Sequence, residues 1–175
     1  MYTYWLVSEF KSIGKTPFIS YPFYLHGGKK ITIGDNFDCN LRVRLEAFEE
    51  HMGHLFTPEI VIGNNVSINP DCHIGAINKI EIGDNVLMAS KVFITDHYHG
   101  EITSEAINTA PSKRKLFSKG PVIIENNVWL GEGVVVLPGV TIGENSIIGA
   151  NSVVTKNIPR NSVVGGNPAR IIRTL

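Results

Sequence analysis

Two histidines and an aspartate stand close together in the segment T-D-H-Y-H-G, which begins at Thr95. An imidazole exchanges a proton near neutral pH, and a neighbouring carboxylate can hold one of its tautomers. His97 and His99 are two residues apart, so in an extended segment their side chains point to opposite sides and only one enters a given cleft. Asp96, or Glu101 further on, could orient that ring. The pattern favours one general base over two exposed loop histidines and leaves open which histidine it is.

The chain offers no second kind of catalytic machinery. No serine or cysteine stands in a nucleophile elbow, and the repeated I-G-x-N segments lack the G-K-[ST] of a phosphate-binding loop. A covalent intermediate has no support, so the residues favour direct transfer assisted by one histidine.

A regular repeat must position these residues, and it is clearest from Val122 to Pro159. An aliphatic residue returns there at every sixth position. Six is a multiple of the two-residue strand period and not of the 3.6-residue helix period, so each hexapeptide is one short strand and one corner. Glycine and asparagine between the strands tolerate the positive φ of a tight corner. One such unit cannot bury its aliphatic side chain alone, so the units must stack as a parallel β-helix with three hexapeptides per triangular coil. The aliphatic residues at every sixth position are Ile124, Leu130, Val136, Ile142, Ile148 and Val154.

The same phase continues towards the N-terminus. Between Ile74 and Ile82 the step is eight, which places a two-residue bulge near Ile77 to Lys79. The strict spacing argues against a β-sandwich. Cys39 and Cys72 fall on inward positions without a C-x-x-C pair, which predicts buried free thiols and neither a disulfide nor a metal site. The earlier rungs are Ile62, Ile68, Ile74, Ile82, Met88 and Ile94, with a weaker coil at Ile33, Cys39 and Leu45.

The repeat divides the chain into an N-terminal aromatic cap segment, residues 1–30, and an all-β domain, residues 31–175. A long excursion loop leaves this domain at about residues 97–120, where long interruptions of a repeat usually carry function. The cap segment holds eight of the fifteen aromatic residues. It either closes the open end of the coil or contacts a membrane surface or a lipid-linked substrate.

Composition narrows the class of protein further. The 175 residues suffice for one domain, and the formal net charge of zero argues against nucleic acid as a partner. No apolar run approaches the roughly 18 residues of a membrane span, and no signal peptide precedes the repeat, so we expect a cytoplasmic protein. His51 and His54 interrupt the repeat without a third ligand beside them, which favours surface histidines over a metal site.

The chain resembles the left-handed β-helix acyltransferases, and within them the sugar O-acetyltransferases. The hexapeptides, the excursion after D-H-Y-H-G, the re-entry P-V-I-I-E-N-N-V-W-L-G and the ending G-G-N-P-A-R-I-I-R carry this resemblance over residues 60–175, and more loosely over residues 31–59. It implies a left-handed coil, a homotrimer with active sites in grooves between subunits, and acetyl-CoA along each groove. No metal is expected.

The resemblance also implies roles for single residues. An ungapped match to the galactoside acetyltransferases places the catalytic base on His99, and a gap of two places it on His97. Asn69 matches the asparagine that meets the acceptor sugar, and Trp129 matches the tryptophan that forms a wall of the site from the neighbouring subunit. Asp96 is counted with these two as substrate-binding. The expected contacts to acetyl-CoA are Gly131, Ala150, Thr155, Lys156, Arg170 and Arg173.

Departures from that family leave alternatives open. The excursion is longer by six residues, and the aromatic N-terminus replaces the helical sugar-binding segment of the galactoside and maltose enzymes. They favour a polysaccharide or its lipid- or nucleotide-linked precursor, as in lipopolysaccharide, O-antigen or capsule modification. The alternatives are an acetyltransferase acting on an antibiotic hydroxyl, a γ-class carbonic anhydrase with zinc on His73, His97 and His99, and a non-enzymatic β-helix. The basic cluster from Lys113 to Lys119 would contact CoA phosphates or an anionic polymer.

Overall fold

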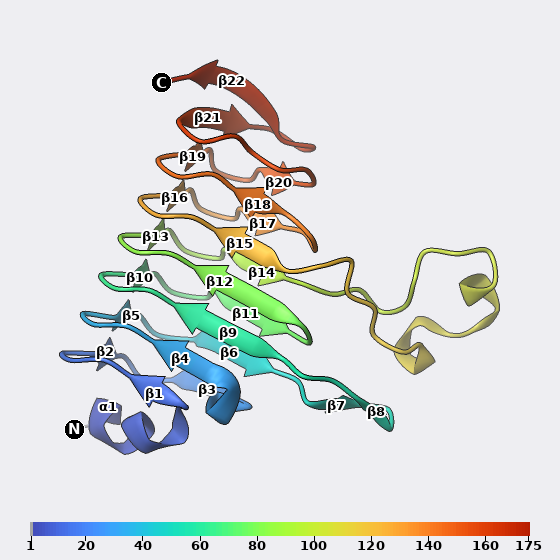
Figure 1. Ribbon diagram of the computed structural model, residues 1–175, viewed down its shortest axis with the longest axis horizontal. Helices are drawn as coiled ribbons and strands as arrows, with labels where there is room; N and C mark the ends of the chain where they lie inside the picture. The colour runs from blue at the N-terminus through green and yellow to red at the C-terminus, as the bar shows by residue number, and fades with distance from the viewer. Residues whose placement is uncertain (1) are drawn as a thin grey trace.

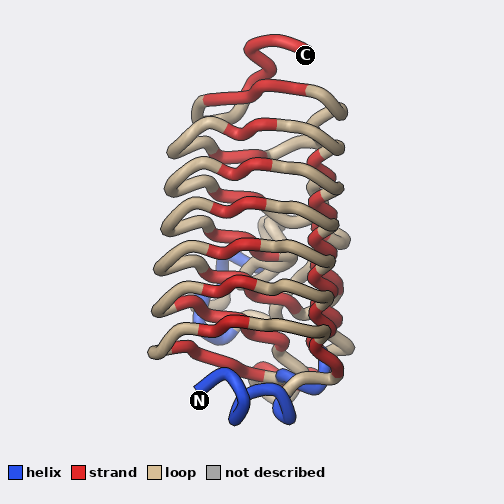
Figure 2. Tube along the Cα trace, turned by 90° about the vertical axis from the view of Figure 1, so that its left-hand side faces the viewer, coloured by secondary structure: helices blue, strands red, loops and turns tan. Residues whose placement is uncertain are grey.

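The computed structural model describes residues 2–175, which form a triangular prism of stacked coils with the two chain ends at opposite ends of the stack (Figure 1). Three parallel sheets, called A, B and C here, make the three faces, and each coil contributes one strand to each face in that order. Seen from the side, the coils stack as evenly spaced rungs (Figure 2). The parallel β-helix predicted from the six-residue period is therefore present.

The strands of each face have the following bounds. Sheet A contains β1 (Ser12–Ile13), β4 (Ile31–Ile33), β9 (Glu59–Ile62), β12 (Lys79–Ile82), β15 (Val122–Ile124) and β18 (Thr141–Ile142). Sheet B contains β2 (Phe18–Ile19), β5 (Asp38–Cys39), β10 (Ser67–Ile68), β13 (Leu87–Met88), β16 (Trp129–Leu130), β19 (Ile147–Ile148), β21 (Ser162–Gly165) and the antiparallel β22 (Arg170–Thr174). Sheet C contains β3 (Phe23–His26), β6 (Val43–Ala47), β11 (His73–Ala76), β14 (Phe93–Thr95), β17 (Val135–Val136) and β20 (Val153–Val154).

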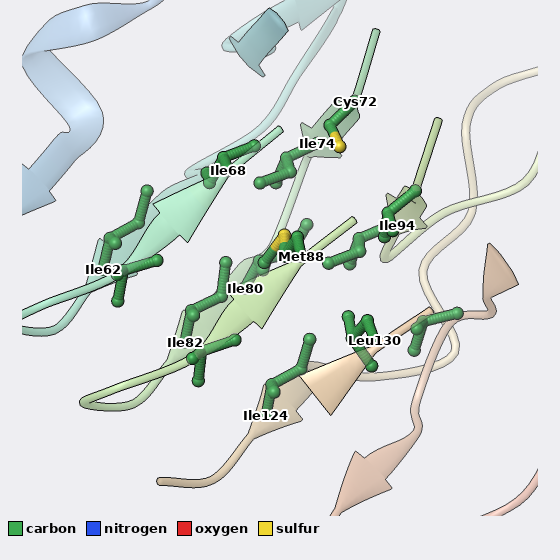
Figure 3. Close-up of a cluster of buried hydrophobic side chains, with 14 of the residues drawn as sticks. Ile62, Ile68, Cys72, Ile74, Ile80, Ile82, Met88, Ile94, Ile124 and Leu130 are labelled. Carbon is green, nitrogen blue, oxygen red and sulfur yellow. The ribbon is translucent and has the colours of Figure 1, made fainter. Parts of the chain in front are cut away.

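The core is a column of aliphatic side chains along the axis of the prism. Ile62, Ile82 and Ile124 lie in register on neighbouring strands, and all three are buried. Figure 3 shows these side chains meeting those of the other two faces, such as Ile68 of sheet B and Ile74 of sheet C. Every hexapeptide thus buries its aliphatic residue against the coils above and below, which confirms the predicted inward positions.

The two cysteines belong to this core, as predicted. Both are buried and neither forms a disulfide. Burial raises the pKa of the Cys72 thiol to about 11 and raises that of Cys39 further. Both side chains are therefore uncharged thiols that pack as small apolar groups.

A ladder of asparagines holds the corner between sheets A and B. Asn65, Asn85 and Asn127 all have φ between 55° and 59°, in the left-handed region. Their side chains bond in series: Asn65 Nδ2 donates to Asn85 Oδ1 at 3.0 Å, and Asn85 Nδ2 donates to Asn127 Oδ1 at 3.1 Å. Asparagine is suited to this corner because it tolerates the backbone conformation and links successive coils.

This ladder gives a stability prediction. Replacing Asn85 with alanine should lower the free energy of unfolding by about 1–3 kcal/mol, because alanine strains the left-handed backbone and both side-chain hydrogen bonds are lost. Asn85→Gly removes the same hydrogen bonds without the strain and should cost less. Urea unfolding of the two variants measures the difference, and equal stabilities would show that the backbone conformation is not the main cost.

The β-helix begins upstream of the predicted boundary at residue 31. Strands β1, β2 and β3 already form a full coil, in which Ile13 pairs with Ile33 and Leu25 pairs with Leu45. Only α1 (Tyr2–Leu6) and the 3₁₀ turn η1 (Val7–Glu9) precede this coil; Met1 lies outside the described residues. A second 3₁₀ turn, η2 (Gly28–Lys30), leads into β4.

The aromatic residues of this first segment divide into two groups. Phe10 and Phe23 are buried in the core, with ring centroids 6.4 Å apart, and so close the end of the coil. The remaining side chains that the structure describes there are exposed: Tyr4, Trp5, Phe18, Tyr21 and Tyr24. Within residues 2–175, no helix is long and apolar enough to cross a membrane.

Two interruptions project from the same side of the prism (Figure 1). The first is a hairpin of β7 (Glu50–His51) and β8 (His54–Leu55). The second leaves after β14 and returns at β15, with 3₁₀ turns η3 (Ala106–Asn108) and η4 (Pro111–Lys113) near its tip. Its neck is closed by reciprocal backbone hydrogen bonds between Tyr98 and Phe117, of 2.9 and 3.0 Å. These bonds fix the start of the excursion, where the candidate histidines lie.

Candidate active site

A pocket of about 240 Å³ opens on sheet C, beside the corner that leads to sheet A. It lies on strands β6, β11 and β14 and on the first residues of the excursion. Its titratable lining residues are Arg44, Glu46, His73, His97 and His99. We call it the histidine pocket. Both histidines that the sequence singled out therefore reach one cavity, and they do so in different environments.

His97 is held by a buried carboxylate. Its Nδ1 lies 3.0 Å from Asp96 Oδ1, and the Asp96 side chain has no solvent-exposed area. The backbone N–H groups of Ile77 and Asn78 donate to the two oxygens of Asp96, at 2.9 and 2.8 Å. The Asp96 carboxylate accepts a hydrogen bond from each of these amides and also accepts one from the His97 ring. The ring proton of His97 is therefore on Nδ1, and Nε2 keeps its lone pair.

The imidazole of His97 is also packed in place. Its side chain is 12% exposed, and Phe48 contacts the ring edge-on at a centroid distance of 6.0 Å. Thr95 Oγ1 lies 3.2 Å from Nδ1. An oriented imidazole with one free nitrogen on a pocket is the arrangement that a general base requires.

His99 has no such support. Its side chain is exposed at the rim of the histidine pocket, and its ring contacts His51 of the β7–β8 hairpin edge-on, at 5.8 Å between centroids. No carboxylate hydrogen-bonds to His99 anywhere in the described part of the chain. His51 is half-buried against His99 of the excursion, whereas His54 is exposed, so the predicted surface position holds for His54 alone.

A second set of hydrogen-bonded side chains lies on the pocket wall beside the Asp96–His97 pair: Arg44, Glu46 and His73. Glu46 Oε2 accepts from Arg44 Nη2 at 2.8 Å and lies 2.8 Å from His73 Nε2. Burial of the ring, and then the charge of Arg44, lower the pKa of His73, which keeps that imidazole neutral near pH 7. Phe93 contacts the same ring at a centroid distance of 5.1 Å.

Four residues of the pocket wall were not predicted from the sequence: Arg44, Glu46, Phe48 and Gly75. A signal was available, because the outward positions of stacked coils lie in register. In the register of sheet C, His73 lies between Arg44 and Phe93 on the neighbouring strands. Gly75 lies between Glu46 and Thr95 in the same way. The register of sheet C therefore identifies the wall of the pocket once the coils are aligned.

Other predicted site residues lie at a different corner of the chain. Asn69 follows β10 at the corner between sheets B and C, and its Nδ2 donates to Met88 O at 2.8 Å. Trp129 lies on the outer surface of sheet B and is 49% exposed. Within one chain neither residue lines the histidine pocket. The described chain thus does not bring Asn69, Trp129 and His97 together.

The predicted contacts to acetyl-CoA are divided in the same way. Gly131 and Ala150 stack at the corner between sheets B and C, where a Cβ on Gly131 would lie 2.7 Å from Ala150 N. Thr155 and Lys156 follow β20 at the corner of His97, on a later coil.

The last two predicted contacts lie near the end of the chain. Arg170 and Arg173 are exposed on β22, the antiparallel strand that closes sheet B. They share a sheet with Trp129 and not with His97. All six candidate CoA residues are thus spread over two corners and one end of the prism.

The basic cluster borders a separate cavity of about 510 Å³ inside the excursion. Lys113, Arg114 and Lys115 line it together with Glu101, and Arg114 Nε donates to Thr109 O at 2.8 Å. Glu101 is therefore on this cavity and not beside a histidine. Among residues 2–175 no group of three or more His, Cys, Asp or Glu side chains is arranged to hold a metal ion.

Known proteins resemble this chain over most of its length. The bacterial transferase hexapeptide family (six repeats) matches residues 121–156. An Escherichia coli K12 protein named putative lipopolysaccharide biosynthesis O-acetyl transferase WbbJ is 42% identical over 159 residues, which cover 89% of this chain and 77% of that protein. A maltose O-acetyltransferase from Clostridium difficile 630 matches with a TM-score of 0.67 and 34% identity, over 97% of this chain and 72% of that one.

A hexapeptide-repeat acetyltransferase from Vibrio cholerae, solved with acetyl-CoA, has a TM-score of 0.68 and 26% identity over 99% of this chain and 75% of that one. The coil and these relatives define the class, a left-handed β-helix acyltransferase. The chain belongs to the hexapeptide-repeat acetyltransferase family and is an enzyme of that family. The identification and the left-handed fold expected from the sequence are confirmed.

Proposed function

We propose that this enzyme transfers an acetyl group from acetyl-CoA to a hydroxyl group of a sugar, with His97 as the general base. The observation that carries the proposal is the Asp96–His97 pair, in which a buried carboxylate holds Nδ1 and leaves Nε2 on the histidine pocket. Relatives named for lipopolysaccharide and maltose O-acetylation support a sugar acceptor, and the relative solved with acetyl-CoA supports the donor.

The chemistry follows from the orientation of His97. Nε2 takes the proton of the acceptor hydroxyl as its oxygen attacks the thioester carbonyl, forming the new C–O bond. Backbone N–H groups stabilise the oxyanion of the tetrahedral intermediate. The intermediate collapses, the C–S bond breaks, and the CoA thiolate takes its proton from the imidazolium. Asp96 stabilises the positive imidazolium between these two proton transfers.

The complete site is proposed to form between copies in a homotrimer. Asn69, Trp129 and Gly131 lie at or near the corner between sheets B and C, whereas His97 lies at the next corner of the same chain. A neighbouring subunit that brings its B–C corner to the His97 corner would complete an acceptor site and an acetyl-CoA groove. In this arrangement Ala150, Thr155, Lys156, Arg170 and Arg173 contact acetyl-CoA from two subunits.

A complementation experiment tests the shared site. Coexpressed His97→Ala and Trp129→Ala chains, each nearly inactive alone, should regain about one quarter of wild-type activity, since that fraction of sites combines an intact His97 corner with an intact Trp129. His97→Ala with Asp96→Asn is the matched control and should regain none, because both defects lie on the same corner. Equal recovery in the two mixtures, or none in the first, would contradict the shared site.

The acceptor is proposed to be a polysaccharide or its precursor, as in lipopolysaccharide, O-antigen or capsule modification. Support comes from the similarity to the lipopolysaccharide O-acetyl transferase relative and from the exposed aromatic side chains of the N-terminal segment. Thiol release from acetyl-CoA should be measured with neutral sugars, nucleotide sugars, oligosaccharides and antibiotic alcohols. Turnover with the antibiotic alcohols alone would replace this proposal with xenobiotic acetylation.

A further inference from the structure

Glu46 is positioned to bind the acceptor beside the reacting hydroxyl. Its side chain is 15% exposed, and the contacts of Oε2 to Arg44 and His73 hold the carboxylate against the pocket wall. Oε1 has no hydrogen-bond partner among residues 2–175, and it is not a buried atom, so it is open to a ligand. A largely buried carboxylate with one unsatisfied oxygen is suited to accept an O–H group from a ligand.

Glu46 and the proposed base flank one open space on the pocket wall. Glu46, Gly75 and Thr95 are register neighbours on successive strands, so Glu46 and Thr95 are two rungs apart, about 10 Å between Cα atoms. Gly75 leaves the space between them open. A Cβ there would lie 3.4 Å from His73 Nε2, 3.7 Å from His97 Cε1 and 3.8 Å from Phe48 Cε2.

The charges of the wall favour a neutral ligand. Arg44 and Glu46 compensate each other, and His73 is kept neutral by burial and by Arg44. Phe48 and Phe93 add apolar ring surface beside these polar groups. Adjacent hydroxyls on an apolar ring face match this combination, whereas a carboxylate or phosphate would find no uncompensated positive charge on the wall.

We infer that the histidine pocket holds a neutral pyranose unit, with one hydroxyl at His97 Nε2 and a second, unreacted hydroxyl on Glu46. This inference rests on the proposed function and makes Glu46 a specificity-determining residue. Arg44 and His73 act through it as positioning residues that fix its carboxylate.

The test measures kcat and KM of wild type and Glu46→Gln with methyl pyranosides, the matching uronosides and a series of monodeoxy analogues. With the neutral pyranoside, kcat/KM should fall about 10- to 100-fold in Glu46→Gln, the value of one hydrogen bond to a charged group, while the KM for acetyl-CoA stays unchanged. One monodeoxy analogue, at a carbon that is not acetylated, should be penalised similarly by wild type and hardly at all by Glu46→Gln.

Two further variants keep the result interpretable. Glu81→Gln removes a carboxylate from the outer surface of sheet A, where it pairs with Lys79 at 2.8 Å, and should behave as wild type. Gly75→Ala places a methyl group at ordinary contact distance from its neighbours, so the protein should fold and lose at least ten-fold in acceptor kcat/KM.

The outcomes separate this inference from the proposed function. If wild type turns over and Glu46→Gln matches it, or if uronosides are preferred, Glu46 does not bind a neutral acceptor. If wild type releases no thiol with any pyranoside, the proposed function fails and this inference fails with it.

Discussion

Replacing His97 with alanine should lower kcat by about 10²- to 10⁴-fold, the contribution of a well-placed general base. The side chain on which Asp96 acts is then missing. The other imidazole of the pocket with a carboxylate partner, His73, has its Nε2 against Glu46 on the wall and is not held by Asp96. Thiol release from acetyl-CoA with a responding sugar measures the loss. Binding of acetyl-CoA should persist, because none of the six candidate CoA residues contacts His97.

His99→Ala is the matched variant, since it removes an imidazole from the rim of the same pocket. It should stay within about ten-fold of wild type, because His99 is exposed and lacks an orienting carboxylate. A silent His99→Ala beside an active His97→Ala would assign the base to His99 and support the ungapped match to the galactoside enzymes. Equal losses in both variants would indicate that the two histidines act together.

The fold was predictable because its signal is local and repeated. Each hexapeptide carries its own inward aliphatic residue and its own corner, so the coil does not depend on distant contacts. The first coil was missed although Ile13, Ile19 and Leu25 are also six residues apart. The corners of this first coil lack the I-G-x-N pattern, and its surface is rich in aromatic residues. The start of the β-helix was therefore predicted too late in the chain, at residue 31.

The choice between His97 and His99 was not predictable from the T-D-H-Y-H-G segment, because it depends on a neighbouring coil. Asp96 is fixed by the amides of Ile77 and Asn78, which are 19 and 18 residues away along the chain. These two residues form the bulge that the eight-residue step between Ile74 and Ile82 indicates. The sequence therefore predicts where the bulge lies, but only the stacked coils show that its amides bind the Asp96 carboxylate.

The positions of Asn69 and Trp129 illustrate a different limit. The resemblance predicts that Asn69 meets the acceptor and that Trp129 forms a wall of the site from a neighbouring subunit. Within one chain both residues lie away from His97, on another corner and another face. Side-chain positions in a single chain do not show which residues meet between subunits, and the complementation experiment tests this for Trp129.

Asp96→Asn should be the most damaging conservative change in the molecule, because the Asp96 side chain both binds two backbone amides and orients His97. Both carboxylate oxygens accept backbone N–H groups, so an amide must turn its NH₂ group towards one of these donors. The amide NH₂ group and the backbone N–H then face each other without an acceptor, which should lower the free energy of unfolding by about 1–3 kcal/mol. With the NH₂ group on the Oδ1 side, His97 Nδ1 must become an acceptor, which moves the ring proton to Nε2 and removes the base.

The expected loss in kcat for Asp96→Asn is therefore about 10²- to 10⁴-fold, as for other histidine bases deprived of their orienting carboxylate. Asp84→Asn is the matched control: Asp84 Oδ1 accepts Asn64 N–H at 2.6 Å at an exposed corner, where Asn64 and Asn126 do the same for neighbouring coils. It should change neither stability nor rate. Thermal unfolding separates the two duties of Asp96, because a variant that melts like wild type yet is inactive would show that orientation of His97 dominates. A variant that melts early but keeps wild-type kcat where it is folded would show that Asp96 is structural and that His97 needs no carboxylate.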